Sequence, residues 1–400
     1  MNNHSRILSG MRPTGRLHLG HYHGAIKNWI NLQYEHECYF MVADLHALTT
    51  GYEETKGIEQ NIYEMVIDWL ACGVDPSQAI IFIQSHVPAH AELHLLLSMI
   101  TPLSWLERVP TYKEQMERLS FKDLGTYGFL GYPLLQSADI LLYNAKYVPV
   151  GEDQVCHVEL TREIARRFNH MYGRELGFEE KAHEAIRKLG TKKAALYEEL
   201  LVNYQQNGDE EALEKARFLL ADAVNLSINE EERLFAFLEN KSKVILIEPH
   251  ALITQTPKLT GVDGQKMSKS YNNTLMLRED ADSINKKIKA MPTDPARIRR
   301  TDPGDPDKCP VWQLHLVYSN DGTKDWVRSG CISAGIGCLD CKKPLIEAIC
   351  TEQAQFNERA APYRGDYNLV RNLLADGAEK ATEVANNTLQ EVKQAMNILY

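Results

Sequence analysis

The 400-residue sequence contains no apolar run that approaches the roughly 20 residues needed to cross a membrane as a helix. Its N-terminus leads directly into a strand-like segment, without the features of a signal peptide, so we expect a cytoplasmic protein. An excess of positive charge is also missing. The formal net charge is −10, which argues against a protein that coats DNA, although a local basic face can still bind nucleic acid. With 44% hydrophobic and 24% charged residues, the composition is that of an ordinary globular protein. The length of 400 residues suggests two or three domains.

A first motif lies between an expected strand and an expected helix near the N-terminus. Residues 6–10 have a short strand pattern, and a helical spacing of apolar residues begins at Gly20. A turn with proline and glycine, residues 12–15, separates them. The start of a helix presents unpaired N–H groups that favour phosphate, and His18 and His21 can donate hydrogen bonds to phosphate oxygens. The alternative is that both histidines only cap a surface helix.

A second motif is the loop Asp263-Gly264-Gln265-Lys266-Met267-Ser268-Lys269-Ser270, which carries two lysines and two hydroxyl groups. Lysine supplies point charges to a polyphosphate, while Ser O–H and backbone N–H groups supply donors. Taken alone, the loop is equally compatible with a mobile basic turn.

Strands alternate with helices through the first half of the chain. Strand patterns cover residues 37–44 and 79–84, and an amphipathic helix pattern runs between them from residue 58 to 70. This alternation predicts βαβ units and a parallel sheet. Residues 44–49 are expected to form a ligand-facing loop at the carboxyl end of the second strand, and residues 244–247 are expected to return to the sheet.

The two motifs together carry a resemblance to a known family. His18-Leu19-Gly20-His21 resembles the HIGH signature of class I aminoacyl-tRNA synthetases, and residues 266–270 are identical to their KMSKS signature. The resemblance implies an α/β fold with a Rossmann-type doubly wound parallel sheet that binds ATP with Mg²⁺. Lys266, Lys269 and His21 are the expected catalytic residues. The implied ATP contacts are Arg12, Pro13, Thr14, His18, Gly20, His21, Gly151, Glu152, Asp153, Lys266, Met267, Ser268, Lys269 and Ser270.

Two later segments narrow the resemblance. Residues 138–144 and 148–154 are similar to the "ADILLYN … VPVGEDQ" pattern of tryptophanyl-tRNA synthetases. An indole is flat and apolar with one N–H donor, so its pocket needs one acceptor in an apolar wall. The resemblance assigns that acceptor to Asp139 and the binding of the amino group to Gln154. The other implied tryptophan contacts are Tyr132, His46, Gln136, Val148, Val150, Leu8 and Gly10.

Two positions depart from the family pattern. Gln115 stands where the family supplies a lysine near ATP, and Gln136 stands where well-known bacterial members have methionine. The implied function is nevertheless a tryptophan–tRNA ligase with ATP, L-tryptophan and tRNA(Trp) as partners, without DNA or membrane, and with a homodimer as the family's usual state. The alternatives are a tyrosyl-tRNA synthetase-like enzyme and a synthetase-like tryptophan or nucleotide binder that regulates without charging tRNA.

The resemblance and the local composition together predict four segments. They are the first part of a catalytic domain (1–177), a helical insertion (178–242), the second catalytic part with the lysine loop (243–285) and a helical anticodon-binding domain (286–400). The insertion carries no motif for chemistry. We interpret it as a packing elaboration, with a contact to tRNA or to a second subunit as the alternative.

Four of the eight cysteines form a cluster in the sequence. Cys309, Cys331, Cys338 and Cys341 have the spacing C-x21-C-x6-C-x2-C, and clustered thiols in a cytosolic chain indicate a metal rather than disulfides. A subset of bacterial tryptophanyl-tRNA synthetases carries a [4Fe–4S] cluster on a similar spacing, so we assign iron–sulfur first, Zn²⁺ second and metal-free thiols third. The remaining cysteines are expected in the core: Cys38, Cys72, Cys156 and Cys350.

Overall fold

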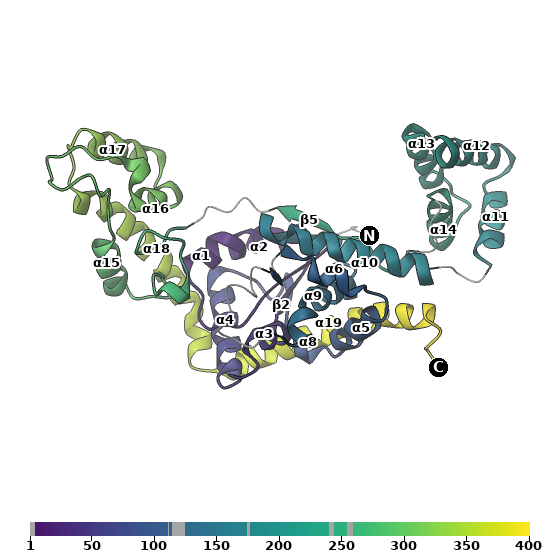
Figure 1. The fold of residues 1–400 in the computed structure, drawn as a ribbon, viewed down its shortest axis with the longest axis horizontal. Coiled ribbons are helices and arrows are strands. Elements are labelled where there is room, and N and C mark those ends of the chain that lie inside the picture. Colours follow the sequence, from purple (N-terminus) through teal and green to yellow (C-terminus); the bar gives the residue numbers. More distant parts are fainter. Residues whose placement is uncertain (1–4, 111, 114–124, 174–176, 240–243, 254–258) are drawn as a thin grey trace. The chain divides into compact units, whose positions relative to one another are not determined.

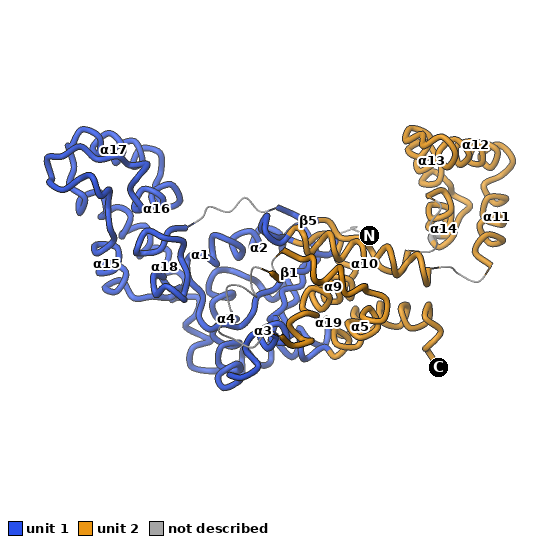
Figure 2. The backbone as a smooth tube through the Cα atoms, viewed as in Figure 1, with its two compact units in different colours: residues 1–87, 149–154, 251–381 blue, residues 88–148, 155–250, 382–400 orange. Residues whose placement is uncertain are grey.

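The computed structural model describes residues 5–110, 112–113, 125–173, 177–239, 244–253 and 259–400. The chain divides into two compact units, which Figure 2 distinguishes by colour. Unit 1 comprises residues 1–87, 149–154 and 251–381, and unit 2 comprises residues 88–148, 155–250 and 382–400. Within the described ranges, no helix combines the length and the apolar character that a membrane crossing requires.

A five-stranded sheet has the order β3-β2-β1-β4-β5, and its strands β2 and β5 are labelled in Figure 1. Its strands are β1 (Arg6–Met11), β2 (Glu37–Val42), β3 (Ala79–Ile83), β4 (Tyr147–Val150) and β5 (His250–Ile253). β2 pairs in parallel with β1 on one side and with β3 on the other. Residues 38–42 of β2 are buried, as expected for a parallel strand covered on both faces. The predicted Rossmann-type parallel sheet is confirmed.

Unit 1 also contains helices. They are α1 (Leu19–His21), the π-helix η1 (Tyr22–Ile26), α2 (Lys27–Leu32), α3 (Asp44–Gly51), α4 (Ile58–Cys72), η2 (Gln84–His86), η3 (Glu152–Gln154), η4 (Lys269–Tyr271), α15 (Ala281–Ala290), η5 (Pro306–Lys308), α16 (Pro310–Tyr318), α17 (Asp321–Ile332), α18 (Cys338–Arg364) and α19 (Tyr367–Ala395), whose end continues into unit 2. α18 packs against α4 and α15.

Unit 2 consists mainly of helices. They are α5 (Ala89–Ser98), α6 (Leu103–Glu107), α8 (Tyr127–Leu130), α9 (Tyr132–Leu142), α10 (Val155–Tyr172), α11 (Phe178–Lys188), α12 (Thr191–Asn207), α13 (Glu210–Ala221) and α14 (Ile228–Leu238). α9, the helix that carries Asp139, packs against α5 and against α10.

The helices α11–α14 have a hydrophobic cluster of their own. The three helices expected within the insertion are present as α12, α13 and α14. Their buried cluster draws only on residues of this segment: Ala182, Ala185, Ile186, Leu189, Tyr197, Leu200, Ala212, Ala216, Leu220, Leu234 and Leu238. The segment therefore buries its apolar side chains against each other.

The loop expected at residues 44–49 is wrong, because these residues begin the helix α3. Asp44 Oδ1 accepts hydrogen bonds from the N–H groups of Leu45 and Ser85, each at 3.0 Å. A carboxylate at a helix N-terminus stabilises the helix. The segment still follows the carboxyl end of β2, as the sequence indicated.

The strand expected at residues 244–247 is also wrong, since β5 begins only at His250. The N–H groups of Ile245 and Leu246 donate to Asn169 Oδ1 at 2.9 and 3.1 Å, and the Ile247 N–H donates to Asn144 Oδ1 at 3.1 Å. Side-chain amides thus satisfy the backbone groups for which a neighbouring strand would otherwise be needed.

Aromatic rings form the centre of the core in unit 1. Trp29 stacks on Phe40 with ring centroids 4.5 Å apart, and it meets Trp69 edge to face at 5.2 Å. Trp69 is fully buried, which confirms the interpretation of this residue as core. Cys38 and Cys72 are buried as predicted, whereas the other two expected core cysteines are only half-buried.

Candidate active site and cysteine cavity

The HIGH-like segment folds onto itself through its two histidines. His18 is the N-cap of α1, and its Nδ1 accepts from the Gly20 N–H at 3.1 Å. His21 Nδ1 accepts from the His18 N–H at 3.2 Å, and the two rings lie 3.8 Å apart. A Cβ at Gly20 would lie 2.9 Å from the His18 ring. Glycine is therefore required for this cap.

Both histidine rings are neutral at pH 7. Burial, with Lys269 as a second cause, lowers the pKa of His18 to about 4. Burial lowers the pKa of His21 to about 3, with His18 and Lys269 contributing. In a neutral imidazole one nitrogen accepts and the other donates. Because Nδ1 accepts in both rings, each Nε2 carries a proton that it can donate to a phosphate oxygen.

The segment after the lysine loop pairs with the HIGH-like segment. The Leu19 N–H donates to the Leu275 carbonyl at 2.9 Å, and the Leu277 N–H donates to the Leu17 carbonyl at 2.8 Å. An antiparallel bridge between His18 and Met276 lies between these bonds. The two motifs, far apart in the sequence, are thereby fixed beside each other within unit 1.

A buried ion pair reinforces this junction. Asp68, on α4, is fully buried and accepts from the Leu17 N–H at 2.7 Å and from Arg278 Nε at 2.5 Å. Arg278 Nη2 also donates to Glu64 Oε2 at 2.8 Å. Arg278 has a left-handed backbone with φ of 59°, which L-residues adopt only where the surroundings demand it. The pair joins α4 to both paired segments.

The lysine loop lies against the N-terminal turn. Lys269 Nζ donates to the carbonyl oxygens of Thr14 at 2.8 Å and Gly15 at 3.2 Å. Asn273, almost fully buried, accepts from the Ser268 N–H at 2.7 Å and donates to the Lys266 carbonyl at 3.1 Å. The Lys266 side chain is exposed. The loop backbone is thus held from within, while one lysine contacts the turn and the other faces solvent.

The other predicted ATP residues also belong to unit 1. Pro13 is buried and Arg12 is exposed, with Arg12 Nη1 3.4 Å from Thr50 Oγ1. A Cβ at Gly151 would lie 2.8 Å from Asp153 Oδ1, so the Asp153 carboxylate folds back over this glycine. Glu152 and Asp153 are exposed in η3.

In unit 2, the predicted indole acceptor is part of a buried polar chain. Asp139 is 1% exposed, and its Oδ1 accepts from His90 Nδ1 at 2.6 Å. His90 Nε2 lies 2.8 Å from the Tyr143 hydroxyl. His90 was not among the residues predicted from the sequence. A carboxylate in an apolar helix signals that a buried partner must exist, but the pattern alone does not identify which residue on another helix it is.

The remaining predicted tryptophan residues divide between the units. Tyr132, Gln136 and Val148 lie in unit 2, and the Tyr132 hydroxyl is 3.4 Å from His157 Nε2. Leu8, Gly10, His46, Val150 and Gln154 lie in unit 1. Their assembly into one pocket stays a prediction. Gln115 lies outside the described residues, and the nearby Lys113 is exposed.

Within unit 1, the four clustered cysteines line one small cavity together with Thr293, Asp294, Arg297 and Val311. Cys341 Sγ is 3.4 Å from His315 Nε2, and Arg297 Nη1 is 3.8 Å from Cys331 Sγ. Burial, followed by the neighbouring cysteines, raises the pKa of the Cys341 thiol to about 12. As they stand, the described residues contain no group of three or more His, Cys, Asp or Glu side chains arranged to hold a metal ion.

Comparison with known proteins identifies the family. The profile of "tRNA synthetases class I (W and Y)" matches residues 1–202 and 223–351. A tryptophan–tRNA ligase of Ralstonia nicotianae is 62% identical over 395 residues, which cover 99% of each chain. That of Thermotoga maritima is 42% identical over 397 residues, covering 99% of this chain and all of that protein.

A solved structure shares the fold. The tryptophanyl-tRNA synthetase from Campylobacter jejuni, complexed with ADP and tryptophan, matches with a TM-score of 0.72 and covers 98% of this chain and 99% of its own, at 24% identity. Together with the profile match and the two relatives, this shared architecture shows that the chain belongs to the class I tRNA synthetases of the tryptophan and tyrosine group.

Proposed function

We propose that the chain is a tryptophan–tRNA ligase, which activates L-tryptophan with MgATP and transfers it to the 3′ end of tRNA(Trp). The observation that carries this proposal is the pairing of residues 17–19 with residues 275–277, which brings the two signature motifs together. The full-length identity with proteins named tryptophan–tRNA ligase supports the choice of amino acid.

The first step requires little covalent chemistry from the protein. The tryptophan carboxylate, already ionised at neutral pH, attacks the α-phosphorus of ATP. The bond to the bridging oxygen breaks, and pyrophosphate leaves with the electron pair. In the second step, a terminal ribose hydroxyl of tRNA attacks the carbonyl carbon and AMP leaves. Positioning and stabilisation of the developing phosphate charge are therefore the protein's main tasks.

We assign that stabilisation to three side chains. His21 Nε2–H is a neutral donor beside the start of α1. Lys269 already contacts the turn expected to hold ATP. The Lys266 side chain is exposed, so it is available to move onto the β- and γ-phosphates. The cationic groups thus compensate the charge of the departing pyrophosphate.

For tryptophan, Asp139 is the proposed acceptor of the indole N–H. The hydrogen bond between His90 Nδ1 and Asp139 Oδ1 orients the carboxylate. His90 is thus a positioning residue, and Gln154 is the proposed partner of the amino group. An acceptor fixed in this way favours an indole over a phenyl ring, since a buried acceptor left unpaired costs free energy.

Tryptophan-dependent ATP–pyrophosphate exchange, run beside tyrosine, tests the proposal. Exchange with tryptophan and charging of tRNA(Trp) are the expected results. Exchange with tyrosine alone would indicate the tyrosyl-type alternative. Absence of exchange with both amino acids, with tryptophan still bound, would indicate the regulatory binder.

We further infer that the cysteine cavity holds a [4Fe–4S] cluster, with Zn²⁺ as the second choice. Four thiols that face one cavity match in number and type the donor set of either group. The nearby Arg297 adds a positive charge that favours thiolates. A bound cluster would tie α16, α17 and α18 together and supply no step of the reaction.

Metal analysis of anaerobically purified protein tests this assignment. Iron and sulfide in a brown protein would support the cluster, and zinc in a colourless protein would support the second choice. A protein that contains neither metal would show that the four cysteines are free thiols. Cys341→Ser should lower the bound metal, whereas Cys350→Ser, outside the cavity, should leave it unchanged.

The domain organisation, the oligomeric state and the cellular location belong to the same proposal. The segments 1–177, 178–242, 243–285 and 286–400 are the proposed domain parts, and the interruption of the family match between residues 202 and 223 supports an insertion there. A homodimer, measurable by light scattering, and a cytoplasmic location accompany the proposed function.

A further inference from the structure

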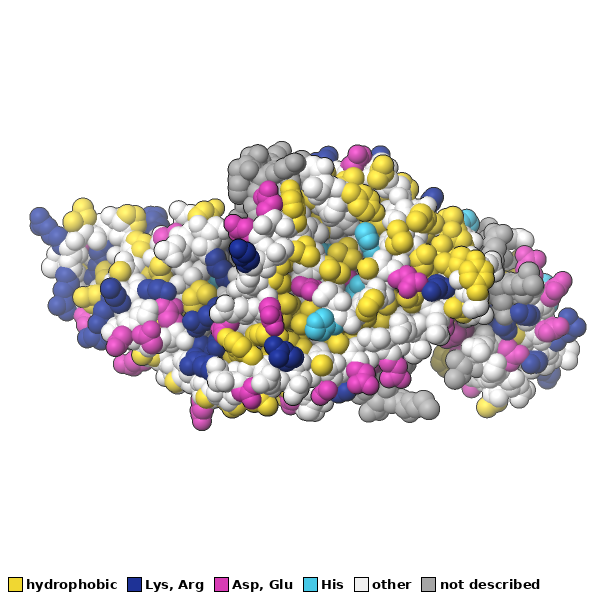
Figure 3. All heavy atoms as spheres, turned by 90° about the horizontal axis from the view of Figure 1, so that it is seen from below, with side chains coloured by type: hydrophobic (Ala, Val, Ile, Leu, Met, Phe, Trp, Pro, Cys, Tyr) yellow, Lys and Arg dark blue, Asp and Glu magenta, His cyan; other side chains and the backbone are white. Residues whose placement is uncertain are grey.

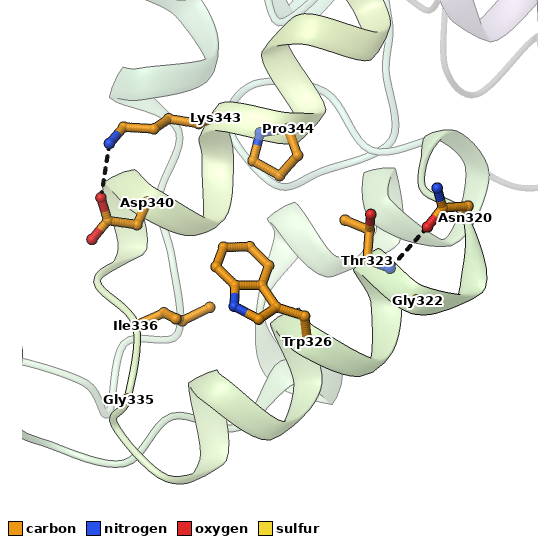
Figure 4. Close-up of a pocket in the computed structure, with 9 residues that line it drawn as sticks. All are labelled: Asn320, Gly322, Thr323, Trp326, Gly335, Ile336, Asp340, Lys343 and Pro344. Carbon is orange, nitrogen blue, oxygen red and sulfur yellow. Dashed lines mark hydrogen bonds and ion pairs between the residues drawn. The ribbon is translucent and has the colours of Figure 1, made fainter.

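A pocket separate from the signature motifs lies in unit 1 between α17, the segment 333–337 and the start of α18. It has a volume of about 700 Å³, within the usual range for small-ligand sites. Nine residues line it: Asn320, Gly322, Thr323, Trp326, Gly335, Ile336, Asp340, Lys343 and Pro344 (Figure 4).

The indole of Trp326 stands in the middle of this pocket. Figure 4 shows its ring between the α17 wall and the opposite wall, with Ile336 pointing toward the ring and Pro344 beyond it. Trp326 is 44% exposed, an unusual placement for the largest apolar side chain. A half-exposed indole face beside apolar side chains is a platform on which another flat ring can stack.

Polar groups surround the indole on both sides. Asn320 Oδ1 accepts from the Thr323 N–H at 2.9 Å, which leaves the Asn320 side-chain NH₂ as a donor at the rim. On the other wall, Asp340 Oδ1 accepts from Lys343 Nζ at 3.0 Å. The Lys343 side chain is 67% exposed, so its charge reaches solvent. The pocket thus combines a stacking surface with hydrogen-bonding groups and a cation.

The wall formed by residues 333–337 is held in place. Arg297 Nη2 donates to the Ile336 carbonyl at 2.7 Å, and the Ile336 N–H donates to the Gly330 carbonyl at 3.2 Å. A Cβ at Gly330 would lie 2.9 Å from Ile336 side-chain atoms, so glycine permits the close contact. A pocket fixed before binding loses less entropy when a ligand enters.

Local charge indicates the class of ligand. Residues 286–343 contain 11 Lys and Arg against 7 Asp and Glu, a surplus of four positive charges in a chain whose net charge is −10. Figure 3 shows Lys and Arg side chains over the end of unit 1 that carries α15–α18. The insertion, residues 178–242, has 9 Lys and Arg against 14 Asp and Glu. A polyanion is therefore favoured at this pocket and disfavoured at the insertion.

We propose that this pocket binds one unpaired nucleobase of the tRNA. The base stacks on Trp326, its edge forms hydrogen bonds with Asn320 and Asp340, and Lys343 contacts an adjacent phosphate. Single-stranded RNA is read in this manner, by stacking on aromatic side chains and by contacts to splayed base edges. The inference rests on the proposed function, which supplies the RNA, and names a subsite for it.

Two variants of Trp326 test the stacking, and a third variant is the control. Trp326→Ala removes the platform and Trp326→Tyr keeps an aromatic face. Leu339→Ala truncates a neighbouring apolar side chain that is more exposed (59%) and does not line the pocket. Each protein is assayed for tryptophan-dependent ATP–pyrophosphate exchange without tRNA, for charging of tRNA(Trp), and for binding of a short hairpin RNA that carries the anticodon loop.

We expect Trp326→Ala to leave exchange within about twofold of the wild type and to raise the KM for tRNA and the hairpin Kd about tenfold. This loss corresponds to about 1.4 kcal/mol. Trp326→Tyr should recover most of it, and Leu339→Ala should behave as the wild type.

Normal charging and hairpin binding by Trp326→Ala, with normal exchange, would overturn the proposal. So would an equal defect in the Tyr and Ala variants, because stacking would then not be the cause. A wild-type protein without exchange would instead refute the proposed function itself.

Discussion

Asp68→Asn tests the buried ion pair that joins the two signature segments. The substitution keeps the size of the side chain but removes its charge. Asp68 is fully buried and accepts from Arg278 Nε and from the Leu17 N–H. Removing one partner of a buried pair costs about 3–5 kcal/mol, because the other charge remains buried. Arg278 keeps its bond to Glu64, so we expect a loss at the lower end, about 3 kcal/mol.

The free energy of unfolding, measured in urea for wild type and variant, gives this loss directly. The variant should also show a kcat for pyrophosphate exchange about tenfold to a hundredfold lower, because a displacement of reacting groups by about 1 Å has effects of that size.

The matched control is Glu59→Gln on the same helix, whose side chain is 72% exposed and pairs with Arg371 at 3.4 Å. It should change the free energy of unfolding by less than about 0.5 kcal/mol. An Asp68→Asn protein as stable as this control would refute the assignment of the ion pair as a lock between the two segments.

Three further outcomes are expected. Lys266→Met should lower kcat for exchange about 10²–10³-fold and leave the KM for tryptophan within about twofold. The control Lys286→Met, at another exposed lysine, should change neither constant. A raised KM with unchanged kcat in Lys266→Met would contradict the assignment. His90→Phe removes the bond to Asp139 and should raise the KM for tryptophan about tenfold or more, with the KM for ATP unchanged; equal changes in both would point to general misfolding. The pKa of His21 is about 3 in the folded chain against 6.5 as the ordinary value, so the unfolded chain binds the proton first as pH falls. Stability should then decrease below pH 6.5 by about 1.4 kcal/mol per pH unit for this residue, and a His21→Asn variant, followed by urea unfolding across that range, should lack this part of the slope.

Local sequence patterns determined most of the secondary structure and the family. The apolar runs that became β2 and β3 are almost entirely buried, as in a parallel sheet covered on both faces, whereas in β1 only Ile7 and Leu8 are buried. The HIGH-like and KMSKS segments have residue types and order that do not depend on distant partners. They were therefore identifiable before any geometry was known, and the full-length relatives agree.

The errors arose where side chains replaced a backbone partner. Residues 244–247 have an apolar strand composition, yet Asn169 and Asn144 satisfy their N–H groups. Asp44 likewise looked like the start of a loop and instead accepts hydrogen bonds at the beginning of α3. The contacts of Asn169 and Asn144 with residues 244–247, and that of Asp44 with Ser85, join residues far apart in the chain, so no local pattern reports them.

The sequence by itself thus determined the strands β1, β2 and β3, the two signature motifs and the presence of four cysteines in one region. Only the tertiary structure decided that Asp68 and Arg278 lock these motifs together, that His90 is the partner of Asp139, and that Trp326 stands in an open pocket. The physical reason is that periodicity records whether a residue is buried or exposed, whereas the identity of its partner depends on how separate elements pack.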